Sequence, residues 1–155
     1  MKLVILRILS AKMTSMNTSF SYYVGSLQDF LAKIKETTDN TLIKTKLDVK
    51  APDSFCHVLD NFAVRHIYAK HSNEKEVLRG QIIVEDSDLL LIPDILNNYD
   101  KCETIVEPNG KTLLTYSKTY PDCIRFYVET VRQGRHELAG VTFYKRKRKL
   151  TGAKS

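Results

Sequence analysis

The stretch that decides the fold runs from Asp122 to Lys147 and reads DCIRFYVETVRQGRHELAGVTFYKRK. Its two halves, Ile124 to Val131 and Glu137 to Lys145, are rich in aromatic and β-branched residues, which favour strands. The sequence Gln133-Gly134 between the halves predicts a turn. The whole stretch is therefore predicted to be an antiparallel hairpin.

A second predicted hairpin precedes the first one along the chain. In CETIVEPNGKTLLTYSKTY, the segments Thr104 to Val106 and Thr112 to Lys118 flank Pro108-Asn109-Gly110, which is typical of a turn. The two hairpins together predict a meander of antiparallel strands in the C-terminal half.

Helices are predicted upstream of this meander. Ser26 can cap a helix from about Leu27 to Thr37, and a second helix is predicted over about Phe55 to Lys70, with a strand at Thr41 to Val49 between them. Short helices are predicted after Asp86 or Ser87 and at Asp94 to Asn98. This order predicts an α+β fold, with N-terminal helices packed on a four- to five-stranded antiparallel sheet. We expect an N-terminal extension with one helix at 1–40, an α+β domain at 41–150 and a disordered tail at 151–155.

Basic residues are concentrated at the C-terminal end. The net charge is +6, and eight of the 24 Lys and Arg residues but only one of the 18 Asp and Glu residues lie from Val131 onward. That segment carries +7 and the rest −1. A concentrated basic segment favours a polyanionic partner, nucleic acid above all, although a solvated tail would have the same composition.

The remaining composition favours a cytoplasmic protein. No apolar run approaches the roughly 18–20 residues that span a membrane, and Arg7 interrupts the apolar start MKLVILRILSAKM, which makes a poor signal peptide. The three cysteines form no close pair, which argues against disulfides and against a structural zinc site. We therefore expect a reducing compartment and no bound metal.

The candidate site lies in RHIYAKHSNEKEVLRGQ, Arg65 to Gln81. His66 and His71 are five residues apart, which turns a helix by about 500° and points the two rings roughly 140° apart. An intact helix therefore presents only one of them to a site, unless the helix ends near Lys70. Either histidine remains a candidate for proton transfer.

Polar residues after the histidines strengthen this candidate. Arg79 and Gln81 alternate to one face at the entrance of a predicted strand, and Gly80 between them permits an unusual φ or a close backbone approach. Arg79 suits a bidentate phosphate contact. Glu76 is either a carboxylate partner for His71 or a solvated acid.

The order of several short patterns resembles a nuclease superfamily. The pattern "HI…KH…KE..RGQI" is followed by a short acidic segment, by "IPDIL…YD", by a hairpin and by a last strand that ends "VTFYKRK". Together, over about Leu47 to Arg148, they look like the phage-associated nucleases of the barnase–EndoU–RelE superfamily, which occur in phages, conjugative elements and bacterial toxins. The resemblance implies N-terminal helices followed by a four-stranded antiparallel meander.

The resemblance also implies an activity. It implies an endoribonuclease without metal or cofactor, a toxin or phage or mobile-element effector, with RNA and an immunity or antitoxin protein as partners and no membrane. The implied site combines a histidine from the helix region, basic residues, a hydroxyl on the last strand and an amide that holds substrate. These are His66 or His71, Arg79 and Lys145, Thr142, and Gln81.

Alternation along the last predicted strand ranks the site candidates that it carries. Thr142 and Tyr144 fall on one face, and Phe143 and Lys145 on the other, so Lys145 ranks below the first two. Cleavage of RNA by its own 2′-hydroxyl, which leaves a 2′,3′-cyclic phosphate, needs a base, an acid and donors for the phosphate charge.

Two further interpretations stay open. Tyr116 and Tyr127, on neighbouring strands, either stack bases or pack in the core. The protein as a whole is alternatively a catalytically inactive nucleic-acid-binding module of the same fold, or a structural phage component in which the histidines are core residues.

Overall fold

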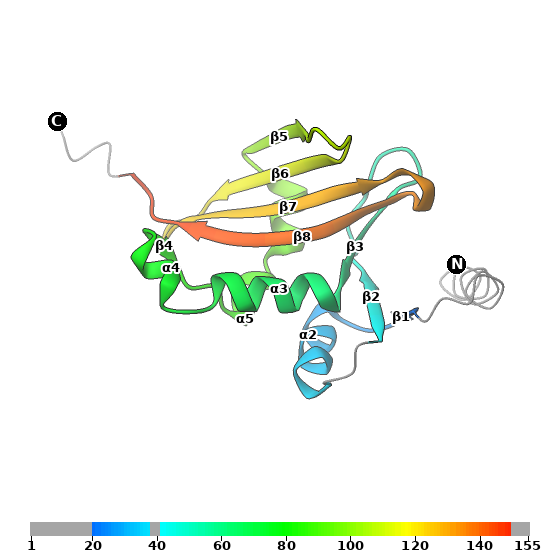
Figure 1. The fold of residues 1–155 in the computed structure, drawn as a ribbon, viewed down its shortest axis with the longest axis horizontal. Coiled ribbons are helices and arrows are strands. Elements are labelled where there is room, and N and C mark those ends of the chain that lie inside the picture. The colour runs from blue at the N-terminus through cyan, green and yellow to red at the C-terminus, as the bar shows by residue number, and fades with distance from the viewer. Residues whose placement is uncertain (1–19, 38–40, 150–155) are drawn as a thin grey trace.

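A computed structural model describes residues 20–37 and 41–149 of the chain as an α+β domain (Figure 1). The strands are β1 Phe20–Tyr23, β2 Leu42–Lys46, β3 Cys56–Asp60, β4 Gln81–Ile82, β5 Lys101–Val106, β6 Thr112–Thr119, β7 Ile124–Arg132 and β8 Glu137–Arg146. The α-helices are α2 Leu27–Glu36, α3 Asn61–His71, α4 Lys75–Leu78, α5 Asp86–Leu89 and α6 Ile92–Asn98. A short 3₁₀ turn, Gln133–Arg135, joins β7 to β8.

The strands form one mostly antiparallel sheet. Its order is β1-β2-β3-β8-β7-β6-β5, and β4 also pairs with β8. The antiparallel meander from β5 to β8 consists of the two predicted hairpins, and β3 joins it parallel to β8. The predicted α+β class is confirmed, and the sheet is wider than the four to five strands expected.

The inner face of the sheet packs against the helices. Tyr116, Tyr127 and Phe143, from β6, β7 and β8, belong to one buried core cluster with helical side chains. The helical members of that cluster are Phe30, Leu31, Ile34, Ala63, Val64, Ile67, Leu89, Ile92, Ile95 and Leu96. Because α2 supplies three of them, its apolar face is part of the same core as the rest of the domain.

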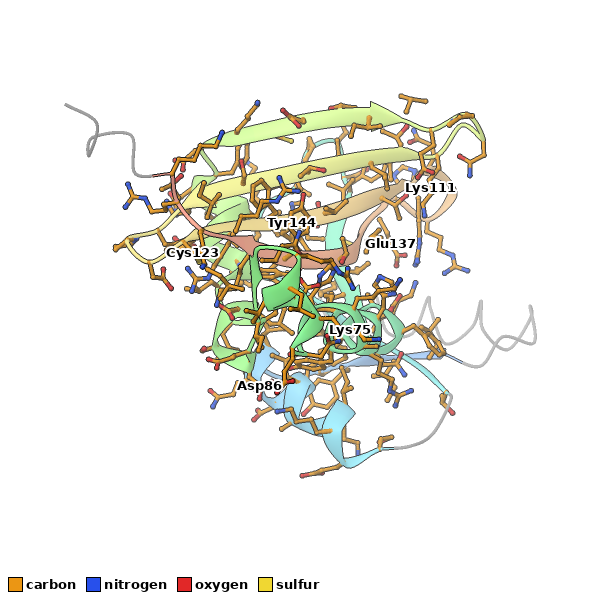
Figure 2. The ribbon with its side chains drawn as sticks, turned by 60° about the vertical axis from the view of Figure 1, so that its left-hand side comes forward. Lys75, Asp86, Lys111, Cys123, Glu137 and Tyr144 are labelled. Carbon is orange, nitrogen blue, oxygen red and sulfur yellow. The ribbon has the colours of Figure 1, made fainter. Side chains whose placement is uncertain are left out.

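The opposite face, which we call the outer face, is partly exposed. On it lie Ser117 of β6, Phe126 of β7, and Thr142, Tyr144 and Arg146 of β8, none of which belongs to the core cluster. Figure 2 labels Tyr144 on β8 and Glu137 farther back along the same strand. The outer face is therefore the side of the sheet on which polar groups meet solvent.

A β-bulge in β8 sets which side chains reach the outer face. Val128 pairs with Thr142, but Glu129 pairs with Gly140, so Val141 is an extra residue. The bulge turns Gly140 inward and Thr142 outward. A Cβ atom at Gly140 would lie 2.5 Å from the hydroxyl oxygen of Tyr127 and 2.7 Å from a methyl carbon of Leu59, so glycine is required there.

The predicted helix over Phe55 to Lys70 is wrong in its first part. Residues 56–60 form β3, which is paired on one side with β2 and on the other with β8. The helix begins only after Asp60, whose carboxylate accepts a hydrogen bond of 2.8 Å from the amide of Ala63. The apolar run at 58–59 is thus a buried strand and not the start of the helix.

Helix α3 lies along an edge of β8 (Figure 1). On this edge β3 pairs with residues 137–139 and β4 pairs with Lys145 and Arg146. Between these two pairings the described strands leave residues 140–144 without a partner on this side, and α3 packs there. The C-terminal end of α3 is consequently brought next to the outer end of β8.

Two sequence expectations fall on segments without a described structure. The apolar start of the chain and the predicted tail at 151–155 both lie outside the described residues. Within 20–37 and 41–149, none of the helices combines the length and the hydrophobicity needed to cross a bilayer.

Candidate functional site

His71 is the last residue of α3 and ends its buried stripe. Val64 and Ile67 precede it by seven and four residues, on the same side of the helix, and both are fully buried against the sheet. The His71 side chain is 14 % exposed, and its Nδ1 lies 2.9 Å from Oε2 of Glu76. His71 thus occupies the next position of the buried stripe, at the end of α3, where an apolar residue would otherwise be expected.

Glu76 is a buried carboxylate that serves this histidine. Its side chain is 0 % exposed and comes from the single turn of α4. Its Oε2 pairs with His71, while its Oε1 lies 3.5 Å from a guanidinium nitrogen of Arg79 and has no hydrogen bond among the described residues. Since an ionised carboxylate only accepts hydrogen bonds, it fixes the His71 tautomer with the proton on Nδ1 and leaves Nε2 as the basic nitrogen.

Gly80 turns the chain from α4 into β4. Its φ is +76°, the left-handed region that the sequence suggested for this glycine. The turn sets Gln81 opposite Arg146 of β8, on the outer face. Arg79, whose side chain is 55 % exposed, lies beside the His71–Glu76 pair as the C-cap residue of α4, before the strand begins.

Aromatic rings extend from His71 across the outer face. The imidazole of His71 lies 6.0 Å from the ring of Tyr144, centroid to centroid. Tyr144 in turn stacks on Phe126 at 4.7 Å, with only 8° between the two ring planes. Burial raises the pKa of Tyr144, and nearby Arg146 opposes the shift, so the phenol stays protonated at neutral pH.

Two side chains near these groups carry buried polar atoms without a partner among the described residues. They are Oγ1 of Thr142 and Oε1 of Gln81. Buried polar atoms are nearly always hydrogen-bonded, so unpaired ones gathered on one face point to a ligand or water that completes them. Thr142, Tyr144 and Gln81 all lie on the outer face with Arg79 and His71 at its edge.

His66 and two other predicted residues lie elsewhere. His66 is exposed on α3, away from the stripe that ends in His71. Tyr116 is buried on the inner face, stacked near Tyr127 with 6.4 Å between ring centroids. Neither Tyr116 nor Lys145 shares the outer face with Tyr144.

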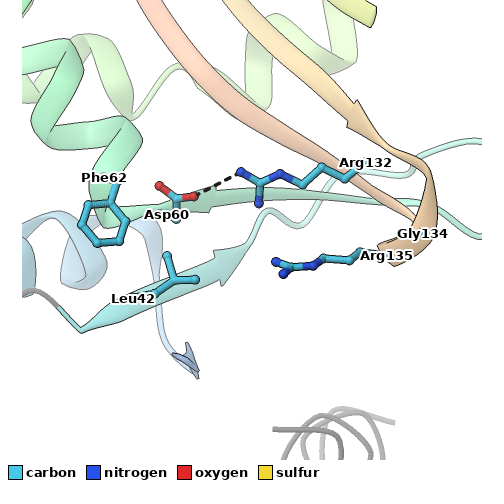
Figure 3. A pocket seen from close by; sticks show the side chains of 6 residues that line it. All are labelled: Leu42, Asp60, Phe62, Arg132, Gly134 and Arg135. Atoms are coloured by element: carbon cyan, nitrogen blue, oxygen red, sulfur yellow. Dashed lines mark ion pairs between the residues drawn. The ribbon is translucent and has the colours of Figure 1, made fainter. Parts of the chain in front are cut away.

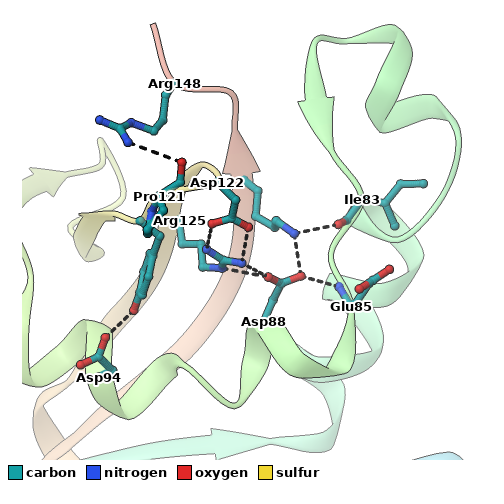
Figure 4. Close-up of polar contacts among 10 residues, drawn as sticks. Ile83, Glu85, Asp88, Asp94, Pro121, Asp122, Arg125 and Arg148 are labelled. Atoms are coloured by element: carbon teal, nitrogen blue, oxygen red, sulfur yellow. Dashed lines mark hydrogen bonds and ion pairs between the residues drawn. The ribbon is translucent and has the colours of Figure 1, made fainter. Parts of the chain in front are cut away.

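Lys145 pairs with Asp88, which belongs to an ionic cluster with Arg125 and Asp122 (Figure 4). Its ammonium donates to Asp88 at 2.9 Å and to the carbonyl of Ile83 at 3.3 Å. Arg125 of β7 donates to the same Asp88 at 2.8 Å and also pairs with Asp122. The cluster ties α5 to the sheet, and the contacts that Lys145 makes within the described residues belong to it.

Sequence reasoning missed a second histidine–glutamate pair. His57 of β3 and Glu129 of β7 lie on the inner face, both buried, with 2.7 Å between Nδ1 and Oε2. Burial raises the pKa of Glu129, and the hydrogen bond from His57 opposes that shift. His57 and Tyr116 also line a pocket of about 650 Å³. No sequence signal pointed to this pair, because His57 falls within the predicted helix over Phe55 to Lys70 and Glu129 is 72 residues farther along the chain.

A basic pocket lies at the far end of β8 (Figure 3). It has a volume of about 610 Å³ and is lined in part by Phe62, Arg132 and Arg135. Arg132 forms long ion pairs of 3.8 Å with Asp60 and 3.7 Å with Glu137. Positive side chains therefore lie at both ends of the outer face.

The described residues offer no obvious metal centre. Across 20–37 and 41–149, no three His, Cys, Asp or Glu side chains come together in a group that could hold a metal ion. What the His71 site presents is an imidazole, a carboxylate, a guanidinium, two hydroxyls and an amide. This set can exchange a proton and bind an anionic oxygen.

Comparison with known proteins identifies the family. The family described as phage-Barnase-EndoU-ColicinE5/D-RelE like nuclease 3 matches residues 33–152. The chain belongs to this nuclease family. The match begins within α2 and includes His71, Glu76, Arg79, Gln81 and the whole of β8. No curated protein and no solved structure shows a significant match to the chain.

Proposed function

We propose that this family member is a metal-independent endoribonuclease that uses the 2′-hydroxyl of RNA as nucleophile. The observation that carries the proposal is the His71–Glu76 pair at the edge of the outer face, with Arg79 next to the same carboxylate. The family match supports nuclease chemistry in general. The choice of RNA and of a metal-free route follows from the kind of groups present.

His71 is the base in this proposal. Nε2 removes the proton from the 2′-hydroxyl, and the oxygen attacks the adjacent phosphorus to form a 2′,3′-cyclic phosphate. Glu76, buried and acceptor-only, holds the imidazole through Nδ1 and stabilises the imidazolium that forms. A positioned base of this kind contributes about 10²- to 10⁴-fold to the rate.

Arg79 and Tyr144 act on the phosphate and the leaving group. Arg79 donates its outward N–H groups to the phosphate oxygens, on which charge grows in the transition state. The Tyr144 phenol, kept protonated by its raised pKa, is placed to donate a proton to the departing 5′-oxygen. Thr142 and Gln81 supply the unpaired oxygen atoms that contact the ribose hydroxyls and base edges.

The first test is cleavage of mixed cellular RNA in EDTA. We expect cleavage by the wild-type protein, with His71→Ala and Arg79→Ala each at least about 100-fold slower, because base catalysis and phosphate stabilisation each contribute that much. His66→Ala is the matched control, since this residue is exposed on the same helix, and its rate should stay near that of wild type. End analysis of the products should find cyclic phosphates.

Other results would contradict the proposal. Activity that disappears in EDTA would replace it with metal-dependent chemistry, and equal rates for His71→Ala and wild type would remove the histidine from the mechanism. Salt-sensitive RNA binding without cleavage at high protein concentration would favour the inactive binding module, for which the basic C-terminal segment is the supporting observation.

The same proposal extends to the biological role of a toxin or mobile-element effector. A free ribonuclease would degrade cellular RNA, so expression in bacteria should arrest growth, and a cognate immunity or antitoxin protein would be needed by the producing cell. Growth curves at matched protein levels provide the measurement. We expect arrest by the wild type and by His66→Ala, and normal growth with His71→Ala; equal growth in all three cultures would contradict the toxin role.

A further inference from the structure

We propose that the outer face holds a base-binding subsite, in which an unpaired nucleobase of single-stranded RNA stacks on Phe126 beside the cleaved phosphate. This inference rests on the proposed function for the position of the phosphate. It goes further in naming the strandedness of the substrate and the residue that selects it. Phe126 lies one strand away from Tyr144 and carries no catalytic group of its own.

One side of the Phe126 ring is free for a ligand. Phe126 and Tyr144 are direct cross-strand neighbours, and their nearly parallel rings are 4.7 Å apart, so both rings stand upright on the sheet. The side of Phe126 that faces away from Tyr144 then faces β6, where its register partner is Ser117. A serine side chain is too small to fill the space beside an upright ring.

Arg146 does not take up that space. Its guanidinium carbon is 5.3 Å from the centroid of Phe126 and 5.3 Å from that of Tyr144. A group equally far from both rings lies beside the pair and not over the free side of Phe126. Arg146 is thereby held next to the stack by cation–π attraction, within reach of a phosphate attached to a stacked nucleoside.

The next strand supplies a contact for the neighbouring phosphate. Ser117 pairs with Lys101 of β5, whose exposed side chain lies on the same face and forms a surface ion pair of 2.6 Å with Glu103, a weak pair that a phosphate can replace. Successive strands are roughly 4.8 Å apart, so His71, Tyr144, Phe126, Ser117 and Lys101 form a row across the sheet. An RNA strand that crosses the sheet along this row meets the catalytic His71 first, then the ring of Phe126, and then the ammonium group of Lys101.

This arrangement requires an unstacked base. In an A-form duplex the faces of the bases are covered by their neighbours, and only single-stranded segments can offer a base to an aromatic side chain. The ring is sequence-tolerant because every base has a π-face, and a purine gains more because its face is larger. We therefore expect cleavage next to unpaired purines.

The test measures binding separately from cleavage. The full-length His71→Ala variant is titrated into a short uridine-rich RNA that carries one central 2-aminopurine, whose fluorescence is quenched by stacking. We expect quenching and binding, and Phe126→Leu in the same background should bind about 5- to 150-fold more weakly without quenching, the range found when a stacking ring is removed. Phe126→Tyr, which keeps the ring, should retain both signals.

A second variant guards against a folding defect in Phe126→Leu. Ser117→Leu places a branched aliphatic side chain in the space beside the Phe126 ring, from an adjacent strand, and should also abolish quenching because leucine offers no ring for the base to stack on. The same oligonucleotide annealed to its complement should be neither bound tightly nor quenched further. Equal quenching by all variants, or equal binding of duplex and single strand, would overturn the subsite.

The outcomes separate this inference from the proposed function. RNA cleavage by the wild type, at rates unchanged by Phe126→Leu and Ser117→Leu, would refute the subsite and leave the nuclease intact. Phe126-dependent quenching in a wild-type protein that does not cleave RNA would support the subsite and refute the proposed chemistry.

Discussion

Glu129 shows at the scale of one residue how a buried acid influences stability. Its carboxylate is fully buried on the inner face, its Oε1 is unpaired among the described residues, and burial raises its pKa above the ordinary value of 4.5. An acid with a raised pKa in the folded state binds its proton more tightly there than in the unfolded chain. Its contribution to stability is therefore greatest when it is protonated and decreases as the pH rises from about 4.5 through the folded pKa.

We predict that Glu129→Gln removes this pH dependence. Glutamine keeps an oxygen that accepts the hydrogen bond from His57, and it never ionises. As the pH rises through that window, the free energy of unfolding of the variant should therefore increase relative to that of the wild type, by up to about 1.4 kcal/mol per pH unit. Urea unfolding of both proteins between pH 4 and pH 8, roughly the range in which buried acids titrate, measures the difference. The exposed Glu103→Gln serves as control and should run parallel to wild type; a constant difference for Glu129→Gln would contradict the prediction.

His66 and His71 show what could and could not be predicted at this scale. The five-residue spacing correctly implied that one helix cannot present both rings to one site. Which of them faces the sheet depends on the register of α3, because His71 continues the stripe of Val64 and Ile67. The spacing of Val64, Ile67 and His71 indicates this register in the sequence. The prediction did not use it, because it began the helix at Phe55 instead of Asn61. Phe126 gave no signal, since a phenylalanine in a strand normally packs in a core.

At the scale of elements, the short helix α5 is held to the sheet by charge. Asp88 is almost fully buried and accepts hydrogen bonds from Arg125, Lys145 and the amide of Glu85. The exposed Asp122 binds the same Arg125 from the loop before β7, and this arginine holds the pKa of Asp122 at about 2. The two carboxylates thus share one arginine and differ in burial.

We predict that Asp88→Asn destabilises the fold by about 3–5 kcal/mol, because it removes the carboxylate that Lys145 pairs with and leaves the buried Arg125 with only the exposed Asp122. Asp122→Asn, which removes an exposed partner of the same arginine, should cost no more than about 1 kcal/mol. Chemical denaturation at neutral pH measures both. Similar costs for the two variants would show that burial does not decide the strength of this cluster.

The elements also show where sequence patterns stop being decisive. The hairpins β5–β6 and β7–β8 were predictable because turn residues separate alternating segments, and α2 because Ser26 caps it. Strand β3 was not, since it is buried on both faces and shows no alternation of polar and apolar residues, so its Val58 and Leu59 fit the apolar stripe of a helix equally well. The capping residue Asp60 was visible in the sequence and marks the true helix start.

For the whole molecule, the basic C-terminal end predicts salt-dependent RNA binding. Lys147 and Lys149 follow β8 on its outer end and are exposed. Each lysine that contacts a phosphate of single-stranded RNA contributes about 0.7 to the slope of log affinity against log salt concentration. In the His71→Ala background, replacing both by glutamine should reduce that slope by about 1.4.

Fluorescence titrations at several salt concentrations provide this slope. The matched control replaces two exposed lysines, Lys33 on α2 and Lys50 after β2, and should leave the slope unchanged. If both double variants lower the slope equally, binding depends on net charge alone and the C-terminal end has no special role.

The bulge at Val141 has a consequence for how this gene can change. Thr142, Tyr144 and Arg146 follow this one extra residue and point outward, while Phe143 and Lys145 stay in the core. Loss of the single codon for Val141 would leave both sets in place, because Gly140 would still pair with Glu129 and Thr142 with Val128, now in a regular strand. Point substitutions can vary the outer face one side chain at a time, whereas a residue inserted between Thr142 and Phe143 would turn Tyr144 and Arg146 into the core and Phe143 into solvent. The strand can therefore lose its extra residue, but it cannot gain a second one without exchanging its two faces.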